Sequence, residues 1–574
     1  MTWKDTYQSW LSFDQLDADL KADLDQLEDD SDQLEDAFYK SLEFGTAGMR
    51  GLMGPGTNRM NIYTVRQASQ GLSDYLLDRF DDAKQRGVAI GYDSRHQSQA
   101  FAFEAAKTLG QSGIKSYVFD SICPTPELSF AVRHFKCRAG IMVTASHNPP
   151  AYNGYKVYGD DGGQLLPQAA DQLTAFVNQV QDPLSVQVAQ KDKLIQAGLL
   201  NIVGPRVDKS YLEMMRSVTL NPDMVEDYAN DLTIVYTPLH GTGQKLVKKA
   251  LYNAGFQNVY DVDSQKGPDP DFSTVESPNP ETEGAFAEAI KVGTKQDADV
   301  LIASDPDADR LGVAVKTVKG SYRVLSGNEI GSLLTHYILK AQFHNKLLPK
   351  YPVVIKSIVS SDLPDRIADS FGARVETVLT GFKYIADRIK FHNESDETSF
   401  MFGFEESNGY LSRSFVRDKD AVQASVLVAE MALYYKLQDF SLVDALFNLY
   451  NHYGHFKDTV FSLSLEGKKG QDKIDQIMEK FRQIPLKDFA GFKVKAKEDY
   501  LSSQRSLAEG GTEDIDLPQS NVLKFQMTDG SWLAVRPSGT EPKIKCYLSA
   551  TDGSKLEVDR KLERLEQAAR QLMD

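Results

Sequence analysis

Residues 88–119 read VAIGYDSRHQSQAFAFEAAKTLGQSGIKSYVF, and this stretch decides the class of fold. The apolar run 88–90 predicts a buried strand, the segment 101–109 predicts a helix, and residues 117–119 predict a second strand. Gly113 stands where the end of a helix needs a residue in the left-handed conformation. A strand–helix–strand unit of this kind predicts parallel strands covered by helices.

Two further segments repeat this order of strand, helix, glycine and strand. They run over residues 233–260, with Gly255 at the end of the helix, and over residues 353–375, with Gly372 there. Repetition at domain-sized spacing predicts three related α/β domains with mixed, largely parallel sheets.

The last part of the chain has a different pattern. Residues 456–465, 532–535 and 544–548 predict strands of a meander, and residues 472–481 and 557–573 predict amphipathic helices. We therefore expect a smaller α+β domain at the C-terminus. The expected domain limits are 1–205, 206–325, 326–455 and 456–574.

The first forty or so residues predict an acidic helix on the surface. Among many Asp and Glu residues, four leucines recur at helical spacing and form a narrow apolar stripe: Leu16, Leu20, Leu24 and Leu27.

Composition narrows the possible functions of the chain. With 574 residues, 41% of them hydrophobic, it is expected to form several globular domains. The formal net charge of −17 argues against broad binding of nucleic acid, which needs a basic surface. We see neither an apolar run long enough for a membrane span nor a secretory signal pattern. Three cysteines without metal-ligand spacing are expected to be free thiols, as in the cytoplasm: Cys123, Cys137 and Cys546.

A candidate nucleophile follows the apolar strand 140–143 directly, in the run Thr144-Ala145-Ser146-His147-Asn148-Pro149. Strand ends are where α/β folds place ligands, and two prolines keep this loop extended. Ser146 alone would be an ordinary surface serine, but His147 offers a hydrogen-bond donor beside it. Lys156 follows shortly afterwards among aromatic residues, where a buried lysine can act as a base.

Asp305, Asp307 and Asp309 alternate in a short loop between two apolar strands. Carboxylates this close repel one another unless a cation lies between them, so an empty acidic loop is the less favoured alternative. The loop is not an EF-hand, because Arg310 occupies the position that requires glycine. Three protein oxygens leave room for a phosphate oxygen, which favours Mg²⁺ over a closed Ca²⁺ site.

Three further turns are candidates for binding substrate. Glu405 and Ser407 lie in a glycine-flanked turn and offer acceptors for sugar hydroxyls. The run Arg536-Pro537-Ser538-Gly539-Thr540 has the composition of a phosphate-binding nest. The glycine-rich turn 45–51 would aim Arg50 at a phosphate. Each of these turns, taken alone, is equally typical of an ordinary surface turn.

In this order the motifs resemble the signatures of the α-D-phosphohexomutase family, over residues 42–547. The resemblance implies four domains around a central cleft, each of which contributes one signature loop. It implies that Ser146 is phosphorylated in the active enzyme, and that one oxygen of this phosphoserine completes a Mg²⁺ site with Asp305, Asp307 and Asp309. It also implies a catalytic role for Arg310.

Other segments resemble the branch of this family that contains bacterial α-phosphoglucomutases and phosphopentomutase. They are residues 403–410, residues 417–420 and the run Thr380-Gly381-Phe382-Lys383. This resemblance implies that Thr380, Gly381 and Lys383 bind substrate and that Lys419 is catalytic. Asn408 and Ala421 depart from the common pattern, which leaves the choice between glucose, mannose and ribose phosphates open.

The resemblance therefore implies a phosphoglucomutase reaction that passes through a phosphoserine and a sugar bisphosphate, with Lys156 or Lys419 as the base. We expect a monomer or homodimer whose ligands are a phosphosugar and a sugar bisphosphate activator, without nucleic-acid or membrane partners. A phosphoserine-type phosphatase and a non-catalytic phosphosugar sensor are the alternatives. A second phosphate site at Arg536 favours the mutase over the phosphatase, and the presence of a nucleophile and metal ligands argues against the sensor.

Overall fold

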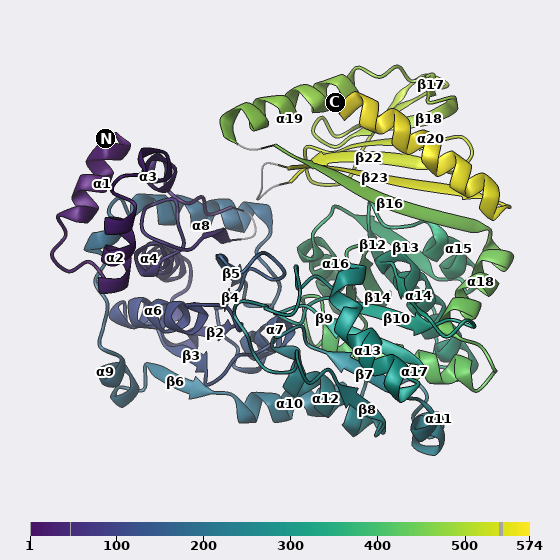
Figure 1. The fold of residues 1–574 in the computed structure, drawn as a ribbon, viewed down its shortest axis with the longest axis horizontal. Helices are drawn as coiled ribbons and strands as arrows, with labels where there is room; N and C mark the ends of the chain where they lie inside the picture. The colour runs from purple at the N-terminus through teal and green to yellow at the C-terminus, as the bar shows by residue number, and fades with distance from the viewer. Residues whose placement is uncertain (1, 46–47, 396, 466, 539–542, 574) are drawn as a thin grey trace. The chain divides into compact units, whose positions relative to one another are not determined.

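The computed structural model describes residues 2–45, 48–395, 397–465, 467–538 and 543–573, and Figure 1 labels most of its helices and strands. The chain forms two compact units. Unit 1 comprises Met1–Leu325, Ile389–Phe391 and Asn408–Lys436, and unit 2 comprises Ser326–Arg388, His392–Ser407 and Leu437–Asp574.

Unit 1 contains two mixed sheets. Its strands are β1 (Met49–Leu52), β2 (Val88–Tyr92), β3 (Ser116–Phe119), β4 (Ala139–Val143), β5 (Tyr152–Tyr158), β6 (Leu200–Val203), β7 (Ile234–Thr237), β8 (Val259–Asp261), β9 (Val300–Ser304), β10 (Leu311–Lys316), β11 (Tyr322–Leu325) and β15 (Gly409–Leu411). The first sheet has the order β1-β5-β4-β2-β3-β6 and the second has the order β11-β10-β9-β7-β8. Strand β2 is parallel to β3 and β4, and β7 is parallel to β8 and β9, whereas β5 and β10 are antiparallel to their neighbours.

The helices of unit 1 pack against these sheets and against one another. They are α4 (Ile62–Arg79), α5 (Ala83–Arg86), α6 (Ser98–Gln111), α7 (Thr125–His134), α8 (Pro167–Gln179), α9 (Lys191–Gln196), α10 (Pro205–Met215), α11 (Pro222–Tyr228), α12 (Gly243–Ala254), α13 (Ala287–Gln296) and α17 (Ala421–Lys436), in addition to three N-terminal helices. Proline opens α8, α10 and α11, where its missing N–H would have no partner in the helix.

The acidic N-terminal region forms three short helices instead of the single one predicted. These are α1 (Trp3–Leu11), α2 (Ala18–Gln26) and α3 (Ser31–Phe38). Asp17 and Asp30 start the second and third helices, because their carboxylates accept hydrogen bonds from backbone N–H groups of the first turn. Trp10, Leu24 and Phe38 are buried together with Tyr63 of α4, so the leucine stripe is only one part of a small core.

Unit 2 combines parallel strands with an antiparallel sheet. Its strands are β12 (Pro352–Ser357), β13 (Arg374–Val378), β14 (Ser399–Glu405), β16 (His455–Ser464), β17 (Asp488–Phe489), β18 (Phe492–Asp499), β19 (Gln504–Leu507), β20 (Thr512–Asp514), β21 (Leu523–Met527), β22 (Trp532–Pro537) and β23 (Lys543–Asp552). Strand β12 is parallel to β13 and β14. The antiparallel sheet has the order β16-β23-β22-β21-β18-β19-β20, and β17 pairs with β18.

The helices of this unit are α14 (Gly327–His344), α15 (Leu363–Ser370), α16 (Phe382–Glu394), α18 (Leu442–Tyr453), α19 (Gly467–Arg482) and α20 (Lys555–Met573). Helices α19 and α20 cover the antiparallel sheet, and their apolar faces share one buried cluster with its strands. The predicted C-terminal α+β pattern is therefore confirmed.

The three predicted strand–helix–strand repeats are also confirmed (Figure 1). They are β2–α6–β3, β7–α12–β8 and β12–α15–β13, and each joins two parallel neighbours. Gly113, Gly255 and Gly372 have φ angles of 76°, 124° and 67°, as the prediction required. Glycine adopts this left-handed backbone readily because it has no Cβ atom. The α/β fold class follows from these units.

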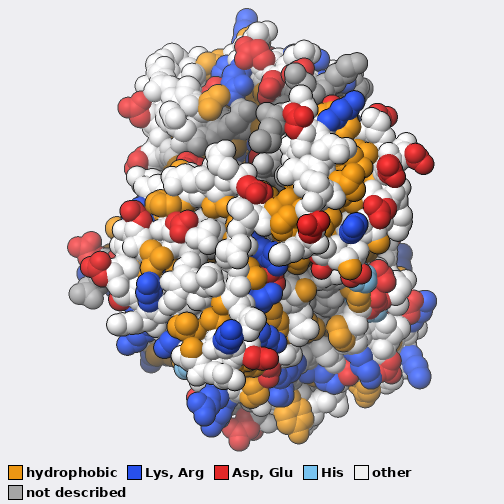
Figure 2. Space-filling model, turned by 90° about the vertical axis from the view of Figure 1, so that its left-hand side faces the viewer, with side chains coloured by type: hydrophobic (Ala, Val, Ile, Leu, Met, Phe, Trp, Pro, Cys, Tyr) orange, Lys and Arg blue, Asp and Glu red, His pale blue; other side chains and the backbone are white. Residues whose placement is uncertain are grey.

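Two expectations from the sequence are free cysteine thiols and the lack of an apolar run long enough for a membrane span. Cys123, Cys137 and Cys546 are buried and form no disulfide. Within the described part of the chain, no helix combines the length and the apolar character that crossing a membrane requires. Figure 2 shows that acidic and basic side chains both occur on the face drawn, with Lys and Arg gathered toward its lower part.

Candidate active site

The serine loop, residues 144–149, follows strand β4, which is an inner strand of the first sheet. Ser146 has a φ angle of 50°, in the left-handed region, which costs a residue with a Cβ atom about 1–2 kcal/mol. Its backbone N–H donates a hydrogen bond of 2.8 Å to Oγ1 of Thr144. The residue is 4% exposed, so its backbone is held in one conformation by buried contacts.

Arg95, which the sequence-based prediction missed, binds the same loop. Its guanidinium donates hydrogen bonds to four backbone carbonyl oxygens, those of Ser146 (2.6 Å), Pro149 (2.8 Å), Tyr152 (3.0 Å) and Asn148. Nε of Arg95 lies 3.3 Å from Oδ2 of Asp93, and both side chains are buried. The run 93–95 follows β2 just as the serine loop follows the neighbouring strand β4, so the strand-end rule that selected Ser146 also applies to it.

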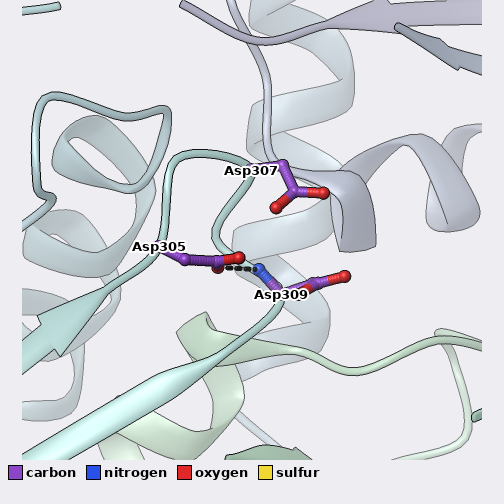
Figure 3. A group of neighbouring side chains, drawn as sticks. All are labelled: Asp305, Asp307 and Asp309. Atoms are coloured by element: carbon purple, nitrogen blue, oxygen red, sulfur yellow. Dashed lines mark hydrogen bonds between the residues drawn. The ribbon is translucent and has the colours of Figure 1, made fainter. Parts of the chain in front are cut away.

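The metal loop, residues 305–310, connects β9 and β10, and Figure 3 shows its three carboxylates. One oxygen of each aspartate lies within 4.8 Å of the others, and all three residues are buried. Oδ1 of Asp305 accepts hydrogen bonds from the backbone N–H groups of Asp309, at 3.1 Å, and Arg310, at 3.0 Å. Oγ of Ser146 donates a hydrogen bond of 2.6 Å to Oδ2 of Asp305, which joins the serine loop to the metal loop.

Two oxygens of the metal loop suit a hard cation. Among the described residues, no hydrogen-bond donor reaches Oδ1 of Asp307 or Oδ1 of Asp309, although both atoms are buried. Buried carboxylate oxygens normally have such partners, and a divalent cation would supply one to both. Burial and the neighbouring carboxylates raise the pKa of Asp305 and of Asp309. A cation would remove this repulsion, so the donor set fits a divalent metal ion.

Two buried lysines contact the metal loop. Nζ of Lys156, on β5, lies 2.8 Å from Oδ2 of Asp307, and this charge lowers the pKa of Asp307 although burial acts to raise it. Nζ of Lys419 lies 3.2 Å from Oδ2 of Asp309 and 3.0 Å from Oδ1 of Asp418. Either ammonium group could exchange a proton with a group bound beside these carboxylates.

Glycine is favoured at position 409 because a Cβ atom there would clash with the buried side chain of Lys419. Thr125, at the start of α7, donates to Asp307 both through its side chain, at 2.9 Å, and through its backbone N–H, at 2.8 Å. Thr125 and Asp418 are thus two further residues that the sequence-based prediction missed. Thr125 lies 182 positions from its partner Asp307 and no local pattern marks it, whereas Asp418 is the neighbour of Lys419 within the segment 417–420.

The other predicted residues of unit 1 are His147, Arg50 and Arg310, and each has a different contact partner. Nδ1 of His147 lies 3.2 Å from Oγ of Ser146. Arg50, on β1, donates a hydrogen bond of 2.8 Å to Oδ1 of Asn148 in the serine loop. Nη1 of Arg310 pairs with Oε1 of Glu281 at 2.6 Å, so this part of its side chain is engaged outside the three carboxylates.

Unit 2 contains the predicted sugar loop at the end of β14. Oε1 of Glu405 accepts a hydrogen bond of 2.6 Å from the backbone N–H of Gly381, whose φ angle is 124°. Oγ1 of the preceding Thr380 is buried and has no hydrogen-bond partner within the residues described. Nζ of Lys383 lies 5.4 Å from the ring centre of its neighbour Tyr384. The two segments 380–383 and 405–407 are therefore joined in space through Glu405.

Arg536 lies at the end of β22 in the same unit. Its Nη2 and Nε atoms donate hydrogen bonds of 3.1 Å and 3.3 Å to Oη of Tyr547. Burial acts to lower the pKa of Arg536, but Tyr547 and the carboxylates of Glu406 and Glu405 raise it overall, so the guanidinium is charged. Ser538 donates its backbone N–H to the carbonyl oxygen of Lys543 at 2.6 Å. The predicted residues Gly539 and Thr540 lie outside the described residues.

Models of four protein domains match this chain in sequence. They are described as α/β/α domains I, II and III and the C-terminal domain of phosphoglucomutase/phosphomannomutase, and they match residues 41–183, 209–320, 326–451 and 486–561. Together these matches include the serine loop, the metal loop, the sugar loop and Arg536.

Known proteins resemble the chain over most of its length. A phosphoglucomutase of Staphylococcus saprophyticus is 39% identical over 89% of this chain and 91% of its own length. A phosphoglucomutase of Staphylococcus haemolyticus is 41% identical over 90% of this chain and 91% of its own length. The solved structure of parafusin, a phosphoglucomutase from Paramecium, has the same fold, with a TM-score of 0.68 at 16% identity over 93% of this chain and 95% of that one.

Proposed function

Because this chain belongs to the phosphoglucomutase/phosphomannomutase family, we propose that it interconverts α-glucose 1-phosphate and glucose 6-phosphate. It is an enzyme of the isomerase type, which transfers a phosphoryl group within its substrate. The observation that carries the assignment of the site is the 2.6 Å hydrogen bond between Ser146 and Asp305. It places a candidate nucleophile directly beside a set of carboxylates that suits a divalent cation.

We assign the divalent ion as Mg²⁺, held by Asp305, Asp307, Asp309 and an oxygen of phosphorylated Ser146. Oδ1 of Asp307 and Oδ1 of Asp309, which accept no hydrogen bond from the residues described, support this assignment, since Mg²⁺ prefers oxygen ligands and binds phosphate oxygens. When bound, such an ion neutralises negative charge on the phosphoryl group.

The reaction proceeds through two phosphoryl transfers. In the first, the bond between Oγ of Ser146 and phosphorus breaks as a hydroxyl oxygen of the sugar phosphate bonds to that phosphorus. The hydroxyl proton passes to the neutral amine of Lys156 or Lys419, which has first given its ammonium proton to solvent, and from that lysine to Oγ of Ser146, which leaves as a hydroxyl. The product is a glucose bisphosphate.

After the bisphosphate has turned round, its other phosphoryl group is transferred back to Oγ of Ser146. The Ser146 hydroxyl gives its proton to the neutral lysine, which passes it to the sugar oxygen that loses phosphorus, so the enzyme returns to its starting state. In this scheme His147, Arg50 and Arg310 are catalytic residues. His147 contacts Ser146 and Arg50 contacts the serine loop, whereas Arg310 belongs to the metal loop. A sugar bisphosphate also serves as activator, because it can phosphorylate Ser146.

Substrate binding is assigned to the loops of unit 2. Glu405 and Ser407 bind sugar hydroxyls together with Thr380, Gly381 and Lys383. Arg536, with Ser538, Gly539 and Thr540, binds the phosphate that is not being transferred. A guanidinium suits this task because its donors match the geometry of phosphate oxygens. A phosphatase would not need this second phosphate site.

The domain limits at residues 205, 325 and 455 stay a prediction, as does a monomeric or homodimeric state. We also propose a cytoplasmic location, because buried thiols without disulfides are typical of a reducing compartment.

The experiment that tests the proposed function is a coupled assay with Mg²⁺ and glucose 1,6-bisphosphate. Glucose, mannose and ribose 1-phosphates are compared as substrates, and inorganic phosphate is measured in parallel. Fastest turnover of glucose 1-phosphate without phosphate release is expected. Preference for mannose or ribose phosphate would reassign the sugar, and release of inorganic phosphate at the rate of substrate loss would make the chain a phosphatase. Binding of sugar phosphates without turnover would make it a sensor.

A further inference from the structure

We propose that Arg95 is a positioning residue for phosphoryl transfer, which holds the backbone of Ser146 in the conformation that the transfer requires. This inference rests on the proposed function of Ser146. It assigns to a buried guanidinium, outside the four signature loops, the task of fixing the nucleophile.

The first step of the argument is the number of loop atoms that Arg95 binds. Its Nη1 and Nη2 atoms donate to the carbonyl oxygens of Ser146, Asn148, Pro149 and Tyr152. Four carbonyl groups from one seven-residue stretch therefore point at a single cation. Without that cation the four carbonyl dipoles would face one another, two of them at buried and two at partly buried positions, where unpaired polar groups are unfavourable.

The second step concerns Ser146 itself. Its φ angle of 50° is uncommon for a residue with a side chain, and such conformations persist only where surrounding contacts hold them. The 2.6 Å hydrogen bond from Arg95 ends on the carbonyl oxygen of this residue. The orientation of that peptide group sets the direction of the Ser146 side chain, and thus its 2.6 Å hydrogen bond to Asp305.

The third step is that Arg95 is itself held rigidly. Oδ1 of Asp93 accepts hydrogen bonds from the backbone N–H of Arg95, at 3.0 Å, and from Oγ of Ser98, at 2.7 Å. Oδ2 of Asp93 lies 3.3 Å from Nε of Arg95. The guanidinium carbon lies 4.9 Å from the ring centre of Phe272. A planar fork fixed in this way can direct its donors at several carbonyl groups, whereas the ammonium of a lysine is a single point charge.

The test compares Arg95→Lys with the double variant Arg95→Met/Asp93→Asn. The lysine variant keeps the charge beside Asp93, and the double variant removes both buried charges together, so that no unpaired carboxylate is left. Arg138→Met is the matched control, because Arg138 pairs with Asp82 and Asp160 in the same domain and is placed in no part of the site. Thermal unfolding of each variant establishes that it is folded.

For Arg95→Lys we expect a loss of about 100-fold in kcat for glucose 1-phosphate, because small misplacements of reacting groups have effects of this size. KM should change less than threefold, since substrate contacts are assigned elsewhere. Intact-mass measurement should show that glucose 1,6-bisphosphate phosphorylates Ser146 more slowly by a similar factor. Arg138→Met should match the parent protein in all three measurements.

The results separate this inference from the proposed function. Parent-like kcat and phosphorylation rate in Arg95→Lys, or in a folded double variant, would overturn the positioning role while leaving the mutase assignment intact. A rise of about 100-fold in KM with unchanged kcat would also overturn the positioning role, since it would show that Arg95 acts in substrate binding. Failure of the parent protein to become phosphorylated on Ser146 would instead overturn the proposed function. If the double variant does not fold, the lysine variant decides the question alone.

Discussion

Oγ of Ser146 donates a hydrogen bond of 2.6 Å to Oδ2 of Asp305, although 159 positions separate the two residues in the sequence. The serine follows strand β4 of the first sheet and the aspartate follows β9 of the second. Each sheet thus delivers one part of the site from the end of a strand, where α/β folds place ligands. The bond joins the proposed nucleophile and the proposed metal ligands into a single cluster, from which the following predictions derive.

Replacement of Ser146 by alanine should abolish turnover, by at least about 10⁴-fold, because the proposed mechanism uses Oγ of Ser146 as the phosphoryl acceptor and alanine has no hydroxyl. Intact-mass analysis should find one phosphate on the parent protein after incubation with glucose 1,6-bisphosphate and none on Ser146→Ala. Ser217→Ala is a suitable control, since the hydroxyl of this exposed serine donates to the nearby carbonyl oxygen of Met214, outside the site. Turnover by Ser146→Ala at the parent rate would refute the phosphoserine mechanism.

Removal of one metal ligand should lower activity by on the order of 100-fold or more, with partial recovery in excess Mg²⁺. Asp309→Asn is the suggested variant, because Oδ1 of Asp309 has no hydrogen-bond partner in the described part of the chain and is therefore available to a cation. Asp263→Asn, on the surface beside Lys266, serves as the control. Chelator should inactivate the parent enzyme and added Mg²⁺ should restore it. Full activity after exhaustive chelation would contradict a catalytic metal site.

Replacement of Arg536 by alanine should reduce kcat/KM for glucose 1-phosphate by about 10- to 100-fold, because a hydrogen bond to a charged group contributes about 1.5–3 kcal/mol. The fraction of phospho-Ser146 lost to water should rise in the same variant. Tyr547→Phe separates the orientation of the guanidinium from its charge, since it removes the hydroxyl that Arg536 binds but keeps the guanidinium itself. A smaller loss is expected for it. Unchanged kinetics in Arg536→Ala would favour a surface turn and reopen the phosphatase alternative.

The stability of the protein should depend on pH through Asp420. Burial raises the pKa of this carboxyl from 3.8 to about 6, although Tyr211 and backbone N–H groups at the start of α17 donate hydrogen bonds to it. Between these pH values the folded protein holds the proton more tightly than the unfolded chain. The contribution of Asp420 is therefore complete below about pH 4 and is lost as the pH rises through about 6, a change of about 3 kcal/mol.

Asp420→Asn mimics the protonated acid, because its amide keeps one oxygen as acceptor for the backbone and can donate to Tyr211. Urea unfolding of both proteins from pH 4 to pH 7.5 should show that the free energy of unfolding of the parent falls relative to that of the variant as the pH rises. Parallel curves would mean that Asp420 does not titrate in this range.

Local patterns in the sequence were sufficient for the elements of the fold and for many candidate residues. The repeated order of apolar strand, helix, glycine and strand predicted three parallel units, because a left-handed glycine and an apolar period act within a few residues. In the same way, the position of Ser146 and of the three aspartates at strand ends needed only local information. The prediction of a single acidic helix at the N-terminus was wrong, because the leucine spacing does not show that Asp17 and Asp30 cap new helices.

Only the tertiary structure decided which distant groups meet. Arg95 lies 51 positions before Ser146 and binds its carbonyl oxygen, and Lys419 reaches Asp309 although the two are far apart in the chain. Such contacts depend on the order and register of strands in a sheet, which the hydrophobic pattern of a single segment does not contain. The charges, burial and hydrogen-bond partners of the candidate site are therefore properties of the folded chain, whereas the types of residue proposed for its chemistry can be selected from local patterns in the sequence.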